Sequence, residues 1–219
     1  MADSPLIIHN SPFKLPQAAF VNKFIAKNKF YEKAALSAKL QKEFIDKIQK
    51  ITWKYKLAEG TVGIAKTDKV TEIQIFEIEL KEQVIPKNVL KVIDKAIPYQ
   101  ILYRFVYKDS EAYAVTLKGQ KPENYYFSDW NEDKVFDFTG IDLEKVYQKV
   151  IKVFITNEAM TKASFHEIVD TDNKIKALEN EIGVLENKIS KEKQFNRKVE
   201  LNKILLERKN QLRKIKEES

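Results

Sequence analysis

Three charged residues at alternating positions, Glu77, Glu79 and Lys81, form the clearest chemical pattern in this sequence. They lie in the run EIQIFEIELK, residues 72–81, whose alternation of apolar and charged side chains predicts a strand. Because alternate side chains of a strand share a face, the three are expected to point the same way. A carboxylate beside a lysine can hold Mg²⁺ and polarise a phosphate or its attacking water, which is nuclease chemistry. The alternative is a strand with one solvated, charged face.

A nuclease of the restriction-endonuclease type also needs an acid fixed on the preceding strand. We predict that strand as TVGIA, residues 61–65, and it contains no Asp or Glu. Asp68 falls in the following turn, and Glu59 precedes the strand. Mg²⁺ would be poorly held without a second fixed carboxylate, because it demands several oxygen ligands in near-ideal geometry. The sequence therefore favours the solvated strand, and it predicts Mg²⁺ only under the nuclease hypothesis.

Other catalytic and metal-binding classes lack the residues they need. The chain has no Cys, which excludes disulfides, thiolate nucleophiles and zinc–thiolate sites. Its two histidines have no partner at metal-ligand spacing, and its five glycines form neither GxxxxGK[ST] nor GxGxxG. No Ser lies in a GxSxG motif. We therefore expect a non-enzymatic protein more than an enzyme, with no metal and no cofactor.

Helices and strands alternate along the part of the chain that must position the charged residues. An irregular segment is predicted at 1–30, which holds three of the six prolines, followed by a globular domain at 31–170. Within that domain we predict helices at 31–51, 86–97 and 142–156, and strands at 52–60, 61–65, 71–81, 99–108, 111–119, 124–130 and 135–138. The fold class is therefore α/β (α+β), a mixed sheet with flanking helices. Its order of helix, three strands, helix and strand resembles the restriction-endonuclease-like core.

Two of these strands differ in how they should be buried. Trp53, Tyr55 and Leu57 alternate with lysines, which predicts a strand with one buried face. Residues 99–108 are apolar on both faces apart from Arg104, which predicts a central strand covered on both sides.

The last part of the chain, residues 171–219, has a different composition and predicts a helical tail. Apolar residues recur there at three- and four-residue steps and later resume in another phase. The loss of phase favours an antiparallel coiled-coil hairpin over one continuous helix. A hairpin this short needs a docking surface, which is its own domain, a second copy or another protein. The residues expected to dock are Ile182, Leu185, Ile189, Phe195, Leu205 and Leu212, with Phe195 closing the end at the bend.

The formal net charge of +7 is concentrated at the two ends of the chain. Lysines and arginines concentrated at the ends of a chain permit non-specific, salt-dependent nucleic-acid binding. They also keep a Lys-rich chain soluble. The candidate nucleic-acid contacts are Lys39, Lys42, Lys47, Lys50, Arg197 and Lys198. The N-terminus lacks the layout of a signal peptide, and no apolar run reaches the ~20 residues of a membrane helix. We therefore expect a cytoplasmic protein with no membrane partner.

Four segments, LPQAAFVNKFIAKNKFYE (15–32), KVTEIQIFEIELKE (69–82), IPYQILYRFVY (97–107) and KEKQFNRKVELN (191–202), resemble domain-of-unknown-function family 4391 of bacteria and archaea. The resemblance covers nearly the whole chain, and it carries no catalytic residues. Members of that family are often encoded near genes for helicases, methyltransferases or restriction-type proteins of mobile-element and phage defence. The resemblance thus implies an accessory subunit with helicase- or methyltransferase-type partners. A metal-dependent nuclease using Glu77, Glu79 and Lys81 is the alternative.

Overall fold

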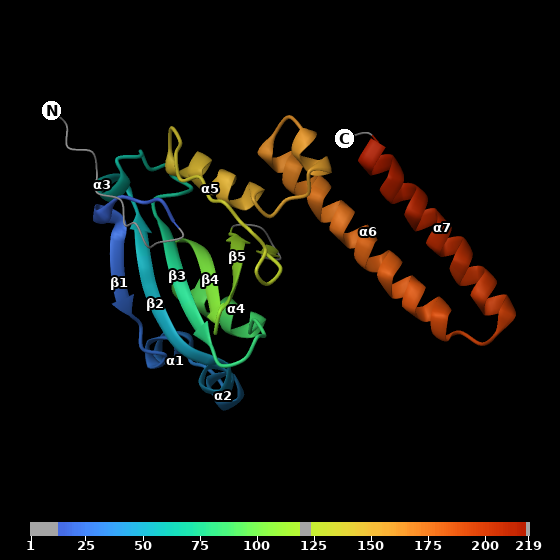
Figure 1. Ribbon diagram of the computed structural model, residues 1–219, viewed down its shortest axis with the longest axis horizontal. Helices are drawn as coiled ribbons and strands as arrows, with labels where there is room; N and C mark the ends of the chain where they lie inside the picture. Colours follow the sequence, from blue (N-terminus) through green and yellow to red (C-terminus); the bar gives the residue numbers. More distant parts are fainter. Residues whose placement is uncertain (1–12, 119–123, 218–219) are drawn as a thin grey trace. The chain divides into compact units, whose positions relative to one another are not determined.

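A six-stranded sheet organises the first of the two units into which the chain divides, Met1–Phe154 and Ile155–Ser219 (Figure 1). The computed structural model describes residues 13–118 and 124–217. The strands lie side by side in chain order: β1 (Phe20–Phe24), β2 (Ile48–Leu57), β3 (Ile73–Leu80), β4 (Gln100–Tyr107), β5 (Ser110–Leu117) and β6 (Asn124–Phe127). β3 and β4 pair in parallel, and the other described neighbours pair antiparallel. The predicted mixed sheet with flanking helices is confirmed.

Helices cover the two faces of this sheet. The helices α1 (Asn28–Ala34), α2 (Ala38–Lys47) and α4 (Lys87–Ala96) bury one face around residues such as Phe44, Leu90 and Phe105. The opposite face carries α5 (Leu143–Lys152), whose Tyr147 hydroxyl donates to the carbonyl of Thr116 at 2.6 Å (Figure 1). Since α4 links the end of β3 to the start of β4, it supplies the crossover that a parallel pair requires.

The helix predicted at 31–51 is instead two helices followed by a strand. Ala35 ends α1 in the left-handed conformation with φ 44°, and the Ser37 side chain caps α2. Ile48 and Ile51, predicted on the helix, are fully buried in β2. Their spacing fits a helix, but pairing with β3 satisfies the backbone and buries them, so tertiary context overrides the local pattern.

Three further predicted elements are wrong. The segment predicted as irregular contains β1, which pairs with β2, and the first residues of α1. Residues 61–65 contain no strand; the short helix α3 (Glu59–Val62) lies there, followed by an isolated parallel bridge from Ala65 to Asp142. Two strands rather than three therefore separate α2 from α4. Residues 135–138 are also not a strand.

A bulge changes which face the residues of β2 occupy. Trp53 pairs with Phe76, whereas Tyr55 pairs with Ile75, so the register shifts between them. Phe76 and Ile75 are adjacent in β3 and point to opposite faces. Trp53 therefore packs on the α4 side and Tyr55 on the other, where its ring meets Phe13 edge-on at 5.9 Å. The predicted alternation of buried and exposed residues in β2 therefore holds before the bulge and after it, but not across it.

The second unit is a helical hairpin, as predicted. Its elements are a short 3₁₀ helix, η2 (Glu158–Thr161), and the long helices α6 (Phe165–Lys191) and α7 (Phe195–Glu217), which lie side by side (Figure 1). The turn contains neither Gly nor Pro. Instead, the Glu192 carboxylate accepts the backbone N–H groups of Lys193 and Gln194 at 2.8 and 2.9 Å, which satisfies donors left free between the helices. No helix among the described residues has both the length and the apolarity needed to cross a membrane.

Candidate functional site

Glu77 and Glu79 lie two residues apart in β3, on the face opposite α4. Lys81 lies one residue beyond the end of β3 at Leu80, and its backbone N–H donates to the carbonyl of Lys47 at 2.9 Å. The structure thus brings the two predicted carboxylates together on one face, and it leaves the predicted lysine just outside the strand.

Cations from the neighbouring strands contact both carboxylates. Glu77 lies 2.5 Å from Arg104 of β4 and 3.2 Å from Lys54 of β2, and Glu79 lies 3.3 Å from Lys50. Arg104 also donates to Glu111 of β5 through Nε and Nη2, at 2.9 and 2.7 Å. These six residues, Lys50, Lys54, Glu77, Glu79, Arg104 and Glu111, form what we call the charged strip.

The chemistry of the charged strip follows from its balance of three cations and three anions. Burial acts to lower the pKa of Arg104, but its hydrogen bond to Glu111 and the charges of Glu111 and Glu77 outweigh burial and raise that pKa. A metal ion would have to displace an ammonium or guanidinium group from each carboxylate. Among the described residues, no group of three or more His, Cys, Asp or Glu side chains is arranged to hold a metal. The geometry favours ion pairing over metal binding.

A cleavage assay tests this interpretation. We expect the protein to cleave neither plasmid nor single-stranded DNA above background in Mg²⁺ or Mn²⁺, because Glu77 and Glu79 already have cationic partners. The Lys81→Ala variant serves as the control for contaminating nuclease. A metal-dependent activity that Lys81→Ala abolishes would restore the nuclease hypothesis.

The stability of the sheet at alkaline pH should report on Tyr113, which borders the charged strip. Burial, a 2.9 Å hydrogen bond to Glu111 and the charge of Glu111 raise the pKa of Tyr113 to about 12. Because this pKa exceeds the ordinary value, its contribution to stability is complete below about pH 10 and is lost as the pH rises towards about 12. Urea unfolding at about pH 9 and about pH 11.5 should show a smaller loss for Tyr113→Phe than for the wild type. Equal losses would contradict the assignment.

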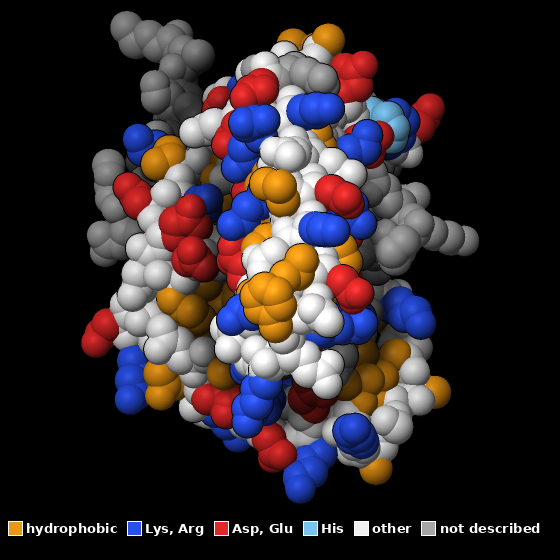
Figure 2. All heavy atoms as spheres, turned by 90° about the vertical axis from the view of Figure 1, so that its right-hand side faces the viewer, with side chains coloured by type: hydrophobic (Ala, Val, Ile, Leu, Met, Phe, Trp, Pro, Cys, Tyr) orange, Lys and Arg blue, Asp and Glu red, His pale blue; other side chains and the backbone are white. Residues whose placement is uncertain are grey.

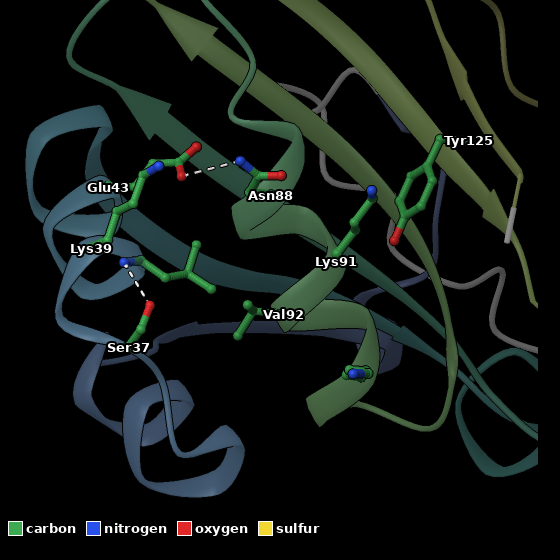
Figure 3. Close-up of a pocket in the computed structure, with 9 residues that line it drawn as sticks. Ser37, Lys39, Glu43, Asn88, Lys91, Val92 and Tyr125 are labelled. Carbon is green, nitrogen blue, oxygen red and sulfur yellow. Dashed lines mark hydrogen bonds between the residues drawn. The ribbon is translucent and has the colours of Figure 1, made fainter. Parts of the chain in front are cut away.

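The lysines predicted to contact nucleic acid have different surroundings. Lys47 pairs with Glu82 and Lys50 with Glu79, whereas Lys42 is exposed. Lys39 lines a groove of about 610 Å³ between α2 and α4 (Figure 3). Fewer of these lysines are available to phosphates than the sequence predicts, because two of the four already have carboxylate partners.

The groove between α2 and α4 also contains residues that the sequence analysis missed. Lys91 and Lys95 of α4 join Lys39, and Lys91 extends towards the ring of Tyr125 (Figure 3). Among the described residues of its lining the one acid is Glu43, which accepts from the Asn88 amide at 3.4 Å. The four-residue spacing of Lys91 and Lys95 was the available signal, since it places both on one side of a helix. Only the packing of α2 beside α4 brings Lys39 to them.

A buried carboxylate, Asp94 of α4, is the second feature that sequence analysis missed. Its side chain is fully buried and accepts hydrogen bonds from Tyr103, Thr116 and Tyr125 at 3.1, 2.9 and 2.6 Å. The Lys118 ammonium lies 3.5 Å away. Burial, followed by the charge of Asp94, raises the pKa of Tyr103 well above its ordinary value. With its partners all within the fold, Asp94 joins α4 to β4, β5 and β6. The available signal was an Asp within the apolar helix predicted at 86–97.

The residues predicted to dock lie in two environments of the hairpin. Ile182 is 9% exposed, and Leu185, Ile189, Leu205 and Leu212 are half-buried where α6 and α7 meet. Phe195 lies at the bend, as predicted, but it does not close the hairpin end, because 79% of it is exposed. The predicted nucleic-acid contact Lys198 is exposed, and Arg197 lies 3.6 Å from Glu200.

Comparison with known proteins identifies the family of this chain. No curated protein and no solved structure matches the chain significantly. Residues 13–212 match the family described as a domain of unknown function, DUF4391, and this match takes in the sheet, the charged strip and nearly all of the hairpin. The chain therefore belongs to the DUF4391 family.

Proposed function

We propose that the protein is a non-enzymatic accessory subunit of a DNA-handling or phage-defence assembly, and that its hairpin docks a protein partner. The observation that supports this most is the outer surface of α7. Val199 is 39% exposed and Leu206 is 61% exposed, and none of the described residues of α7 is buried. Ile204 is exposed as well, at 41%, and exposed large apolar side chains gathered on one helix are typical of a surface that meets a partner.

The apolar seam keeps α7 beside α6. Three ion pairs also join the two helices, Arg208–Glu181 at 2.8 Å, Lys209–Glu186 at 2.7 Å and Lys216–Glu179 at 3.0 Å, and they add little because they are largely exposed. Val199 and Leu206 are seven residues apart, which is close to two turns at about 3.6 residues per turn, so they share one side of α7. We call Val199 and Leu206 the outer stripe.

The partner class follows from the family. The proximity of its members to genes for helicases, methyltransferases and restriction-type proteins, which the resemblance implies, supports a subunit of one of these types as the partner. A second copy of the chain is the other occupant that the outer stripe fits, since two-fold dimers are the commonest oligomers. The ion-paired charged strip supports a non-enzymatic role, because its carboxylates have cationic partners.

Co-expression with helicase- and methyltransferase-type subunits from the same genome tests the proposal. We expect a complex by size-exclusion chromatography with light scattering. Leu206→Glu should weaken it at least tenfold, which is about 1.4 kcal/mol, because it places a charge in an apolar contact. Gln211→Glu introduces the same charge elsewhere on exposed α7 and should leave the complex intact.

Circular dichroism shows whether Leu206→Glu keeps the helical content of the wild type. If no complex forms, or if Leu206→Glu and Gln211→Glu act alike, the docking proposal is wrong. A homodimer that Leu206→Glu dissociates would assign the outer stripe to a second copy.

A further inference from the structure

The end of the hairpin concentrates positive charge. Residues 187–199 contain five cationic side chains and one acidic residue, Glu192. The cations are Lys188, Lys191, Lys193, Arg197 and Lys198. The net charge of this short segment is therefore +4, against +7 for the whole chain. We call residues 187–199 the hairpin tip.

Pairing within the chain neutralises little of this charge. The Glu192 carboxylate accepts the backbone N–H groups of Gln194 and Lys193, and these hydrogen bonds together with the charge of Arg197 lower its pKa. Arg197 pairs with Glu200 at 3.6 Å, but their side chains are 63% and 67% exposed, and exposed pairs of this kind are weak. The cations of the hairpin tip therefore remain available to an external anion.

The hairpin tip also has a hollow and an exposed ring. A cleft of about 540 Å³ lies between the ends of α6 and α7. Its apolar lining is Val184 and Leu201, and its polar lining is Asn187, Lys188, Lys191, Glu192 and Arg197, so three cations there face one carboxylate. Phe195, at the start of α7, is 79% exposed. Figure 2 shows hydrophobic side chains among Lys and Arg side chains over the hairpin. A bulky aromatic ring in water has no role in packing here, and its exposed face can stack on a planar group.

We propose that the hairpin tip binds single-stranded nucleic acid, with Phe195 stacking on a base and the surrounding cations neutralising phosphates. Single strands carry closely spaced negative charges and expose the flat faces of their bases, which match the two features of the tip. An acidic protein surface would match the charge alone. An anionic membrane would match the charge and the apolar ring, so the experiment must separate it from nucleic acid.

This binding is independent of the proposed partner docking. The hairpin tip supplies Phe195 and the cations, whereas docking uses the outer stripe, of which only Val199 lies within the tip. Leu206, the residue that tests docking, lies 11 residues after Phe195, about three helical turns away. Leu206→Glu should therefore weaken the protein complex and leave nucleic-acid binding unchanged, and Phe195→Ala should do the reverse.

Fluorescence anisotropy of labelled oligothymidylate and oligouridylate with the full chain tests the proposal. Phe195→Ala should weaken binding roughly 5- to 150-fold, the range for removing one stacked base, and Phe195→Trp should retain it. The exposed apolar Leu206→Ala is the matched control and should bind like the wild type.

Salt dependence tests the cations separately. Arg197→Gln with Lys198→Gln should reduce the slope of log K against log salt by about 1.4, because each phosphate of a single strand that is no longer neutralised reduces it by about 0.7. Lys203→Gln with Lys214→Gln removes the same charge from exposed positions of α7 outside the hairpin tip, and its slope should equal that of the wild type.

Four results would each overturn the proposal. The first is no binding to either oligonucleotide at low salt. The second is binding that Phe195→Ala leaves unchanged. The third is binding of polyglutamate as tight as that of the oligonucleotides, since charge alone would then explain it. The fourth is Phe195-dependent binding to vesicles of phosphatidylserine and phosphatidylcholine without binding to oligonucleotides, which would assign the tip to a membrane surface.

Discussion

Replacing Asp94 with Ala should destabilise the protein by about 3–5 kcal/mol, the largest effect that we expect from any single substitution proposed for this chain. The substitution leaves the hydroxyls of Tyr103, Thr116 and Tyr125 without their acceptor inside the fold, and it leaves the mostly buried Lys118 without its nearby carboxylate. A buried polar group that loses its hydrogen-bond partner has still been removed from water, so the folded state bears the full desolvation penalty of that group. Urea unfolding followed by circular dichroism measures the change.

Asp46→Ala is the matched control for Asp94→Ala. Asp46 is exposed on α2, so its replacement should change the free energy of unfolding by about 0.5 kcal/mol or less. If Asp94→Ala were as mild as Asp46→Ala, Asp94 would not anchor α4 to the sheet. Its burial and its hydrogen bonds would then need a functional explanation outside folding.

Replacing Arg104 with Met should destabilise the protein by about 2 kcal/mol. Arg104 joins Glu77 and Glu111, and its removal leaves Glu77, with a side chain 13% exposed, dependent on Lys54 alone. Breaking a fully buried ion pair costs about 3–5 kcal/mol, and we expect less here because the Arg104 side chain is 22% exposed. Chemical unfolding at neutral pH and moderate salt measures the change.

A double-mutant cycle separates the ion pair from general packing. Glu77→Gln in the Arg104→Met background should recover part of the stability, with a coupling energy between about 0.5 and 3 kcal/mol. Arg213→Met is the exposed control: Arg213 lies 3.7 Å from Glu217 with a side chain 68% exposed, so its removal should cost about 0.5 kcal/mol or less. A coupling energy of zero would mean that the Arg104–Glu77 pair does not stabilise the fold, and that the effect of Arg104 comes from Glu111 and from packing.

Local sequence patterns predicted an element correctly where its own residues determine its ends, or where the element is buried on every side. Pro86 and Asp142 mark the starts of α4 and α5, and the apolar run 99–108 is the central strand β4. The heptad seam and its change of phase placed the hairpin, because a seam of this kind reflects packing between two helices of nearby sequence. The pairing of Glu77 and Glu79 on one face follows from strand geometry in the same way.

Local patterns were misleading where a distant partner determines the structure. Ile48 and Ile51 fit a helix by their spacing and join β2 because β3 lies beside them, and the bulge after Trp53 cannot be read from an alternating run. The same holds for the site. Strand periodicity alone places Glu77 and Glu79 on one face, but the folded sheet is what brings their cationic partners to them and turns a nuclease pattern into ion pairs. The physical reason is that charge balance is set by neighbours in space, which lie on strands far apart in the chain.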